Sequence, residues 1–481
     1  MDKGKGNEGA NAGTFPPGRA RAPPVVLITT VLPFLVMAAI ALAPLELDNA
    51  VKYMLAVLAC ISLLWTLGSL PLAVTALLVP ILLTLFGLTS ASGALLPFGD
   101  PVAFLIVGGL FIAEAFKASG LDRRIAFIMV SAAGGDIRKT FLALMAVSAF
   151  LSMWISNTAT VALLVPVVLT MAGKAGGNDR KITRLFLIGA CIATAFGSMS
   201  TMIGTPVNAI TSGLLAQAVP WTFLDWFKAG AVVSIVLLAF AYIVLPKVLP
   251  VRSKTIDIVP IKEELSAMGS LTAREKKVLA VFLPTIAVWI FGADIAAATG
   301  LPAGFLNAAV IALLAAFLLL LIKAMEWSEA RRIDWDIYLI IGAGLALGEA
   351  LESTGAAAWI ASQVDAAAGG LSLLALMMVM GALSVLVTTV LSNTATVAIL
   401  VPIVISVSAA MGLEPQAPVL VTAFCASISL ITPVGTPSIT IAYNTGMIGR
   451  AELARTGLVV TLPAMLIVVL LVYAMASMGW I

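Results

Sequence analysis

Residues 156–168 read SNTATVALLVPVV, and residues 392–404 read SNTATVAILVPIV. The two phrases differ at only two positions, and each change exchanges one branched apolar residue for another. A phrase of this length that recurs half a chain later indicates an internal structural repeat. Which fold the repeat builds depends on the solvent that surrounds it.

The composition is that of an integral membrane protein. Hydrophobic residues make up 61% of the 481 residues and charged residues 11%, whereas soluble domains average about 25% charged residues. Apolar runs of about 20 residues recur, the length with which a helix crosses a hydrocarbon core about 30 Å thick. The alternating segments of a membrane β-barrel are not visible. The sequence therefore predicts an all-α, polytopic membrane protein.

The reactive residue types are few. Cys60, Cys191 and Cys425 all lie inside apolar runs, where a free thiol behaves as a small buried hydrophobe. Neither a disulfide framework nor a metal cluster is indicated. The chain has no histidine, the side chain that most often relays protons near neutral pH.

The apolar runs predict eleven transmembrane helices and two re-entrant hairpins. The helices are expected at residues 25–44, 51–69, 71–88, 101–118, 185–216, 228–246, 277–292, 303–322, 336–351, 417–446 and 457–479. The hairpins are expected at 139–171 and 370–411, which are too long for one crossing and have an SNT phrase near the middle.

Polar segments flank these runs. Residues 1–24, rich in Gly, Pro and Ala, are expected to form a disordered cytoplasmic tail. A signal peptide is the alternative for residues 25–42, but their apolar core is longer than a typical h-region. Residues 247–276 are expected to form a cytoplasmic linker between a first repeat, 25–246, and a second repeat, 277–481.

The distribution of Lys and Arg predicts the orientation in the plasma (inner) membrane. With the amino terminus in the cytoplasm, only Lys52 and Lys228 of the 27 basic residues fall outside, as the positive-inside rule requires. This distribution holds only if neither hairpin crosses the membrane. The first hairpin then enters from the cytoplasm and the second from the opposite face, and the carboxyl terminus lies outside.

Two further pairs of segments match between the halves. FLIVGGLFIAEAFKASG at 104–120 is similar to YLIIGAGLALGEALESTG at 338–355, and GTPVNAI at 204–210 is similar to GTPSITI at 435–441. Matched segments that enter from opposite faces are typical of the inverted-topology repeats of secondary transporters. The fold is therefore predicted to be two inverted repeats.

The SNT and GTP motifs predict a binding site in the middle of the membrane. Ser, Asn and Thr suit the turn of each hairpin, where the next helix presents free N–H groups that attract an anion. The free carbonyls of the preceding half-helix suit a cation. Gly and Pro in each GTP motif suit a break in the long span that follows. The alternative is that these residues only cap and kink helices.

The lack of nearby charge indicates the coupling ion. No Lys, Arg or His lies within ten residues of either Ser-Asn-Thr triplet (156–158 and 392–394) or of the GTP motifs. An anion buried there needs mobile cations as partners, which favours sodium coupling. Proton coupling is less favoured, since the acids Glu114, Glu349 and Glu352 lie toward helix ends.

At the paired SNT phrases and the two GTP motifs, the chain resembles the divalent anion sodium symporter (DASS) family of INDY-like carboxylate transporters. The resemblance implies a homodimer in which each protomer has a scaffold domain and a transport domain that moves by an elevator mechanism. It implies dicarboxylate substrates, with citrate and sulfate in some branches. The implied substrate-binding residues are Ser156, Asn157, Thr158, Thr205, Pro206, Ser392, Asn393, Thr394, Thr436 and Pro437.

The resemblance also implies two sodium sites. The first consists of Ser152, Ser156, Asn157 and the Gly204 carbonyl, and the second of Thr388, the Leu391 carbonyl, Asn393 and the Gly435 carbonyl. Leu391 is bulkier than the small residue typical of that position, although a carbonyl ligand tolerates this.

The sequence thus predicts a sodium-coupled importer of C4 or C5 dicarboxylates (succinate, malate, fumarate or 2-oxoglutarate) and not an enzyme. A sodium-independent dicarboxylate exchanger, a sulfate or citrate symporter and an anion channel are the alternatives. An intramembrane serine hydrolase is excluded because no histidine is available to activate a serine.

Overall fold

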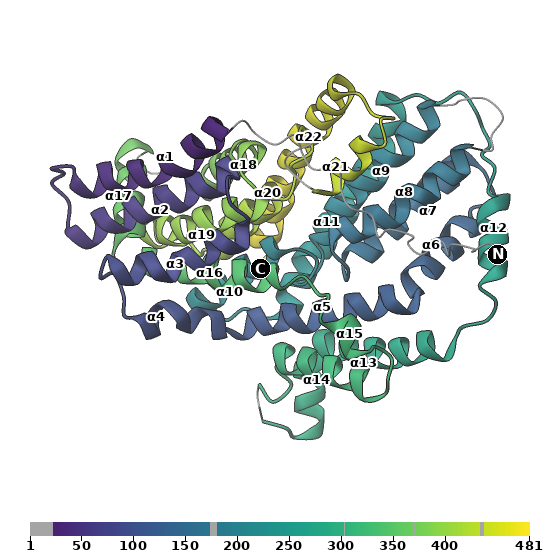
Figure 1. Cartoon of the computed structure of the whole chain (residues 1–481), viewed down its shortest axis with the longest axis horizontal. Helices are drawn as coiled ribbons and strands as arrows, with labels where there is room; N and C mark the ends of the chain where they lie inside the picture. The colour runs from purple at the N-terminus through teal and green to yellow at the C-terminus, as the bar shows by residue number, and fades with distance from the viewer. Residues whose placement is uncertain (1–22, 174–179, 303, 369–371, 433–436) are drawn as a thin grey trace, which may run out of the picture.

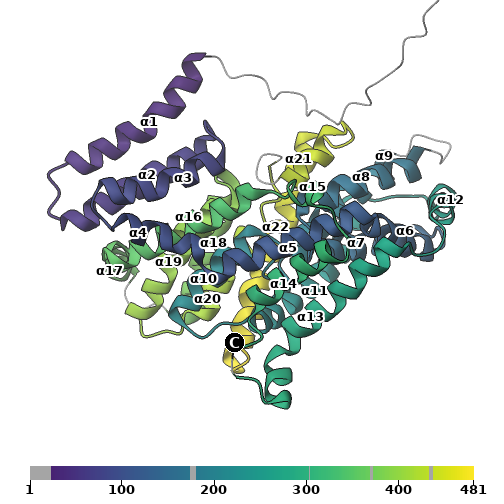
Figure 2. The same ribbon diagram turned by 60° about the horizontal axis from the view of Figure 1, so that its bottom comes forward.

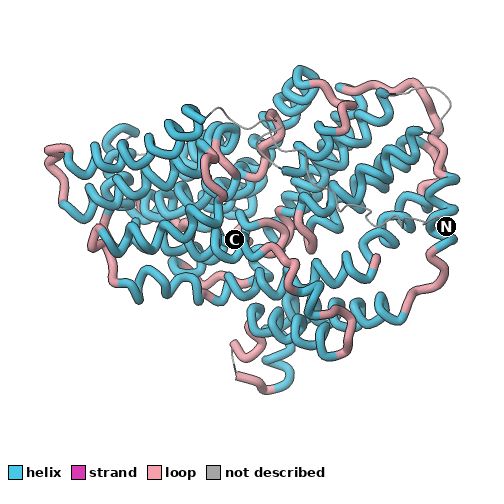
Figure 3. The backbone as a smooth tube through the Cα atoms, in the orientation of Figure 1, coloured by secondary structure: helices cyan, strands magenta, loops and turns pink. Residues whose placement is uncertain are grey.

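The computed structural model describes residues 23–173, 180–302, 304–368, 372–432 and 437–481. Within these ranges the chain is built of helices joined by loops (Figure 3). The sole extended pairing found there is one isolated β-bridge, between Asp136 and Thr255. The prediction of an all-α membrane protein is confirmed. Of the expected tail, residues 1–24, the first 22 lie outside the described residues.

Figure 1 labels the helices along the chain. The first half contains α1 (Pro23–Leu42), α2 (Asn49–Leu67), α3 (Leu72–Leu85), α4 (Ala91–Leu95), the 3-10 helix η1 (Leu96–Gly99), α5 (Pro101–Ser119), α6 (Leu121–Ala132), α7 (Ile137–Ser152), α8 (Asn157–Gly173), α9 (Arg180–Ser198), α10 (Pro206–Ala218) and α11 (Phe223–Val248). After α12 (Val259–Ala267), the second half contains α13 (Ala273–Thr299), α14 (Ala308–Leu321), α15 (Trp327–Ala330), α16 (Trp335–Ser353), α17 (Ala356–Ala368), α18 (Leu373–Val390), α19 (Asn393–Ala410), α20 (Gln416–Ala426), α21 (Pro437–Asn444) and α22 (Arg450–Ser477).

The number of membrane-crossing helices depends on how broken spans are counted. Among the described residues, eight helices are long and apolar enough to cross a bilayer, or nine if α16 and α17, bent by 71°, form one span. Four of the eleven expected spans, those at α1, α3, α14 and α20, contain an apolar helix that is shorter than the 18 residues needed to cross. The 14 residues of α3 rise only about 21 Å at 1.5 Å per residue. The two helices of the second hairpin, 18 residues each, are long enough by this measure to cross, so length alone does not separate a hairpin from two crossings.

Besides the very short α4, η1 and α15, three longer helices lie in segments that the hydropathy pattern did not predict as helical. They are α6, α12 in the expected linker, and α17 after the span that begins at residue 335. Each is short and contains polar residues along with apolar ones, so it gives no membrane-span signal. The linker is therefore partly ordered, and its residue Ile256 donates its N–H to the carbonyl of Gly135, 2.9 Å away.

The two halves use their helices in the same way. In the first half, α7, α8 and α11 pack against α9; in the second half, α18, α19 and α22 pack against α20. Each half also packs on the hairpin of the other half: α10 packs against α19 of the second hairpin, and α21 packs against α8 of the first. The repeat seen in the sequence thus recurs in the packing.

Glycines permit close contacts between the last helix of each half and the neighbouring break. A Cβ on Gly230 of α11 would lie 2.3 Å from the Met199 carbonyl oxygen, and a Cβ on Gly457 of α22 would lie 2.3 Å from the Leu430 carbonyl oxygen. Both carbonyls belong to the segments that interrupt the broken spans. Small residues let helix backbones approach in this way inside membranes. The last helix of each half therefore supports the break next to it.

A buried ion pair joins α6 to α13. Arg124 and Glu275 lie 2.6 Å apart with side chains 6% and 1% exposed. Arg124 also donates to the carbonyl oxygens of Met268, Gly269 and Ser270. These bonds occupy most of the guanidinium donors, as a buried charge requires. The helix that precedes the first hairpin is thus fixed to the second half of the chain.

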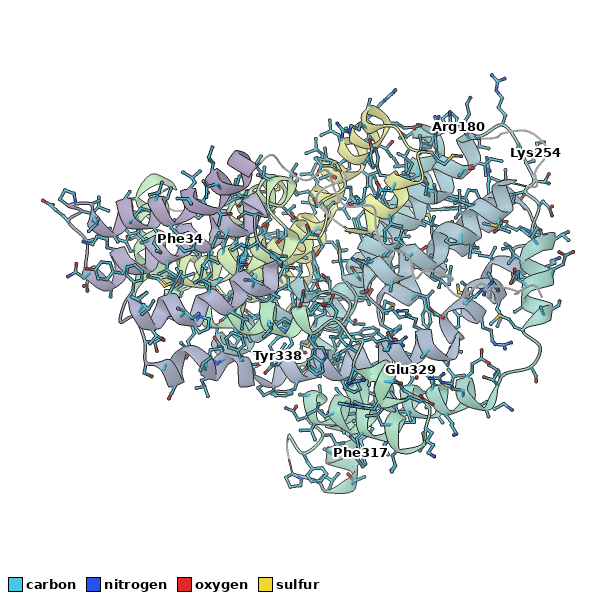
Figure 4. All side chains as sticks on the ribbon, in the orientation of Figure 1. Phe34, Arg180, Lys254, Phe317, Glu329 and Tyr338 are labelled. Carbon is cyan, nitrogen blue, oxygen red and sulfur yellow. The ribbon has the colours of Figure 1, made fainter. Side chains whose placement is uncertain are left out.

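Exposed apolar side chains mark the surface that faces lipid. Phe317 of α14 is 59% exposed and points outward in Figure 4, and Ile235 and Leu386 are each 66% exposed. Basic residues gather elsewhere: Arg180 and Lys254 lie near each other at one end of the molecule (Figure 4). Such a separation of apolar and basic surfaces is typical of a multi-pass membrane protein.

Candidate functional site

The two SNT phrases form the same local structure. The Ser156 hydroxyl accepts a hydrogen bond from the Ala159 N–H at 3.3 Å, and the Ser392 hydroxyl accepts one from the Ala395 N–H at 3.2 Å. Each serine thereby caps the helix that begins at the next residue, Asn157 in α8 and Asn393 in α19. Both halves therefore have an ordinary serine cap at the start of the second hairpin helix.

The remaining polar atoms of the first phrase are not all used. The Asn157 amide nitrogen donates to the Ser198 hydroxyl at 3.2 Å, and that hydroxyl donates to the Ala195 carbonyl at 2.9 Å. The Asn157 side-chain oxygen is buried and has no hydrogen-bond partner. An amide oxygen can accept a hydrogen bond or coordinate a cation. The amide is held by its nitrogen with its oxygen free to accept a ligand.

Ser198 and Thr201 connect the first hairpin to the broken span α9–α10. The Thr201 hydroxyl donates to the Met153 carbonyl at 2.5 Å. The break itself needs glycine at position 204, since a Cβ there would lie 2.2 Å from the Ser198 carbonyl oxygen. The hairpin turn and the break are therefore adjacent.

The predicted ligands of the first sodium site belong to these two adjacent segments. Ser152, fully buried at the end of α7, donates its hydroxyl hydrogen to the Ala149 carbonyl at 3.0 Å and keeps its oxygen lone pairs. Ser156 and Asn157 follow in the same turn, and Gly204 lies in the neighbouring break. All of these ligands would be neutral oxygens, and unwound backbone of this kind coordinates sodium in secondary transporters.

The second half places a compact group of oxygens at its own hairpin. The Thr388 hydroxyl lies 2.7 Å from the Asn393 side-chain oxygen and 2.8 Å from the Ala426 carbonyl oxygen. The Ser429 hydroxyl donates to the Thr388 carbonyl at 3.1 Å. These bonds join α18, α19 and the break after α20 in the same way that Ser198 and Thr201 do in the first half. Leu391 ends α18 with an extended backbone, φ −90° and ψ 167°.

Two of the predicted site residues, Gly435 and Thr436, lie outside the described residues. Pro437 begins α21, and Pro206 begins α10 with Thr205 before it. Proline suits the first turn of a helix because its missing N–H is not needed there. The Thr205 side chain makes no capping hydrogen bond to α10.

The polar surface of the site is accessible and uncharged. Ser156 is exposed, and Asn157, Thr158, Thr205 and Pro206 are partly exposed. In the second half Ser392, Asn393 and Thr394 are also partly exposed. Acidic, cysteine or histidine residues form no group that could hold a metal ion anywhere in the described ranges. The arrangement offers hydroxyls, amides and helix N–H groups to an anion, with neutral oxygens beside them.

Four contributors were not predicted from the sequence: Ser198, Thr201, Asn208 and Ser429. The Asn208 amide nitrogen donates to the carbonyl oxygens of Ser198 at 2.8 Å and Thr201 at 2.7 Å, which braces the break. A signal existed, because SMSTMIGTP at 198–206 and SISLITPVGTP at 427–437 share serines before the GTP motif. Their spacing differs by two residues, which obscured the match.

The family's profile, described as the sodium:sulfate symporter transmembrane region, matches residues 25–480. The chain belongs to this family of divalent anion sodium symporters. It is a transporter of that family and not an enzyme.

Relatives in the family are similar over most of their length. The chain is 31% identical to a Haemophilus influenzae protein named an uncharacterized transporter, over 89% of this chain and 91% of the relative. It is 28% identical to the sodium-dependent dicarboxylate transporter SdcS of Staphylococcus saprophyticus, over 94% of this chain and 89% of the relative.

Solved structures show the same fold at lower identity. MtrF of Neisseria gonorrhoeae, described as one of a class of antimetabolite efflux pumps, has a TM-score of 0.59 and 16% identity, with 95% of each chain covered. The YdaH transporter of Alcanivorax borkumensis has a TM-score of 0.56 and 15% identity, covering 95% of this chain and 97% of that one. These similarities concern the fold alone.

Proposed function

We propose that this protein imports C4 or C5 dicarboxylates, such as succinate, malate, fumarate and 2-oxoglutarate, together with sodium. The observation that carries the proposal is the buried Asn157 side-chain oxygen without a partner, beside the capped amino terminus of α8. The amino terminus favours an anion, and the free oxygen favours a cation. A carboxylate and a sodium ion bound side by side would satisfy both.

The second half supplies the matching end of the substrate. A dicarboxylate has two anionic groups, and α19 has the same serine cap and exposed polar turn as α8. Sodium at each hairpin would offset the charge that the protein does not neutralise, since no Lys or Arg lies near either turn in the sequence. The SdcS relatives, named sodium-dependent dicarboxylate transporters, support this substrate class and this ion.

We infer an elevator motion from the way the helices are grouped. The hairpins and broken spans pack on one another and on α11 and α22, and α10 and α21 interlock the two halves. This group can move as one body against α2, α3, α5, α13, α14 and α16. We also propose a homodimer, inverted topology for the two repeats, and an amino terminus in the cytoplasm with the carboxyl terminus outside.

Uptake of labelled succinate into proteoliposomes tests the proposal. We expect accumulation that requires an inward sodium gradient and is inhibited by malate, fumarate and 2-oxoglutarate. Uptake that needs internal dicarboxylate instead of sodium would make the protein an exchanger, and competition by sulfate or citrate alone would change the substrate class. Ionic currents far above carrier turnover would indicate a channel.

A further inference from the structure

A basic cluster lies at the end of the molecule where the first hairpin begins. It consists of five exposed side chains: Arg138, Lys139, Arg180, Lys181 and Lys254. The first two lie in the first turn of α7, and the next two lie in the first turn of α9. Lys254 belongs to the linker, and its carbonyl accepts the Ile137 N–H at 3.0 Å. Figure 2 shows α6, α7, α9 and α12 together at this end.

The amino termini of α7 and α9 lie at the same end because the two helices run parallel. A Cβ on Gly189 of α9 would collide with the ring of Phe141, and a Cβ on Gly197 would collide with the backbone of Ala149. The contacts thus advance in the same direction along both helices. Arg180 accordingly lies near Lys254 in Figure 4. The basic cluster is therefore assembled from three segments of the chain.

The basic cluster has little negative charge beside it. None of its five side chains forms an ion pair with a described residue. The sequence places two acids next to the cluster, Asp136 and Asp179, so five positive charges less two negative ones leave three. Asp136 caps α7, since its carboxylate accepts the Lys139 N–H at 3.0 Å. Cations are disfavoured at the amino terminus of a helix, so the cluster does not serve the stability of α7 or α9.

Next to the cluster, α7 presents an apolar face. One side of the helix contains four residues spaced by three, four and four positions: Lys139, Leu142, Ala146 and Phe150. Leu142 is 48% exposed and Phe150 is 37% exposed. At about 1.5 Å per residue the face is about 17 Å long from Lys139 to Phe150, close to the roughly 15 Å of one leaflet of a hydrocarbon core. A cation therefore lies at one end of an apolar face that has the length of a lipid chain.

We propose that this face of α7 binds an anionic phospholipid, with the headgroup phosphate at the basic cluster and an acyl chain along Leu142, Ala146 and Phe150. An anionic membrane surface attracts Lys and Arg side chains that lie at its level, and long basic side chains extend from an apolar surface to that level. A soluble anion would pair with the cations and leave the apolar residues uncovered. A phospholipid covers both parts of the surface.

The second hairpin provides an internal comparison. Its first helix, α18, also faces lipid, with Val379 50% exposed and Leu386 66% exposed. The whole of α18, Leu373–Val390, contains no charged residue. A hairpin helix of this fold therefore forms and faces lipid without cations at its start. Of the two hairpins, only the first is expected to select an anionic headgroup.

Photolabelling of the full chain in phosphatidylcholine liposomes tests the site. The probe is phosphatidylglycerol or phosphatidylcholine, each with a diazirine on the same acyl chain, and labelling is compared on the peptides of α7 and α18. We expect a preference for the phosphatidylglycerol probe on α7 and none on α18. One cation at an anionic surface strengthens binding about fivefold. Lys139→Gln should therefore reduce the preference about fivefold, and the double variant Arg138→Gln, Lys139→Gln should reduce it about 25-fold.

The matched control removes two exposed basic residues outside the cluster, by Lys262→Gln and Lys276→Gln, and should leave the preference unchanged. Glycerol phosphate added to the water at constant ionic strength should not compete, because it has no acyl chain. Equal preferences on α7 and α18 in the wild type, an unchanged preference in the double variant, or an equal loss in the control would overturn the proposal. Competition by glycerol phosphate would also overturn it, since the cluster would then bind a soluble anion. The labelling needs neither sodium nor succinate, so its outcome is separate from the test of transport.

Discussion

Removing the side chain of Asn157 tests the first sodium site most directly. In Asn157→Ala, the protein loses the unpaired side-chain oxygen and the 3.2 Å hydrogen bond to Ser198. The neutral hydrogen bond contributes about 1 kcal/mol to stability, so folding should be nearly unaffected. A bond to a charged partner contributes about 1.5–3 kcal/mol. Loss of one sodium ligand should therefore raise the sodium Kd roughly 10- to 150-fold.

In the assay, sodium is titrated into the purified protein and binding is measured as the rise in thermal stability. Succinate uptake is measured in parallel. Ser198→Ala is the matched control, because it removes the acceptor of the Asn157 amide nitrogen and leaves the side-chain oxygen in place. The control should raise the sodium Kd far less than Asn157→Ala. A sodium Kd in Asn157→Ala equal to that of the wild type would refute the assignment of this oxygen as a ligand.

Two further substitutions separate roles that the sequence does not distinguish. Arg124→Ala leaves Glu275 buried without its ion-pair partner, which should destabilise the protein by about 3–5 kcal/mol. The control Arg123→Ala breaks an exposed ion pair, which contributes only about 0.2–1 kcal/mol. Similar losses of thermal stability in both variants would contradict the structural role given to Arg124. Thr388→Val removes the hydroxyl that contacts the oxygens of Asn393 and Ala426 and should abolish sodium-driven uptake. The control Thr389→Val, whose hydroxyl bonds only within its own helix in the structure, should retain uptake, and loss of uptake in the control alone would reverse the assignment.

The helix breaks illustrate how far sequence reasoning reaches. Ser156 and Ser392 were predicted to lie at hairpin turns because Ser, Asn and Thr interrupt apolar runs, and both serines do cap the helices that follow. Pro206 and Pro437 were predicted to restart broken spans, and each begins a helix. Local rules suffice here because caps and proline positions depend on neighbours within one turn.

Residues that act across helices were not predicted. Ser198 and Asn208 have polar side chains inside apolar runs, and nothing in their own neighbourhood shows that both meet the same break. The ion pair between Arg124 and Glu275 joins residues far apart in the chain. Short polar helices such as α6 and α12 were missed for a related reason, since hydropathy reports membrane spans and not amphipathic segments.

The sequence by itself showed that the protein lies in a membrane, that it is helical, that it contains a repeat and which family it belongs to. These follow from composition and from phrases that are read locally, because a lipid environment leaves the backbone few alternatives to helix. Only the tertiary structure decided which oxygens lack partners, which carbonyls are braced and which cations gather at one end of the molecule. Hydrogen-bond satisfaction and the clustering of charge depend on contacts between distant segments, and a linear pattern contains neither.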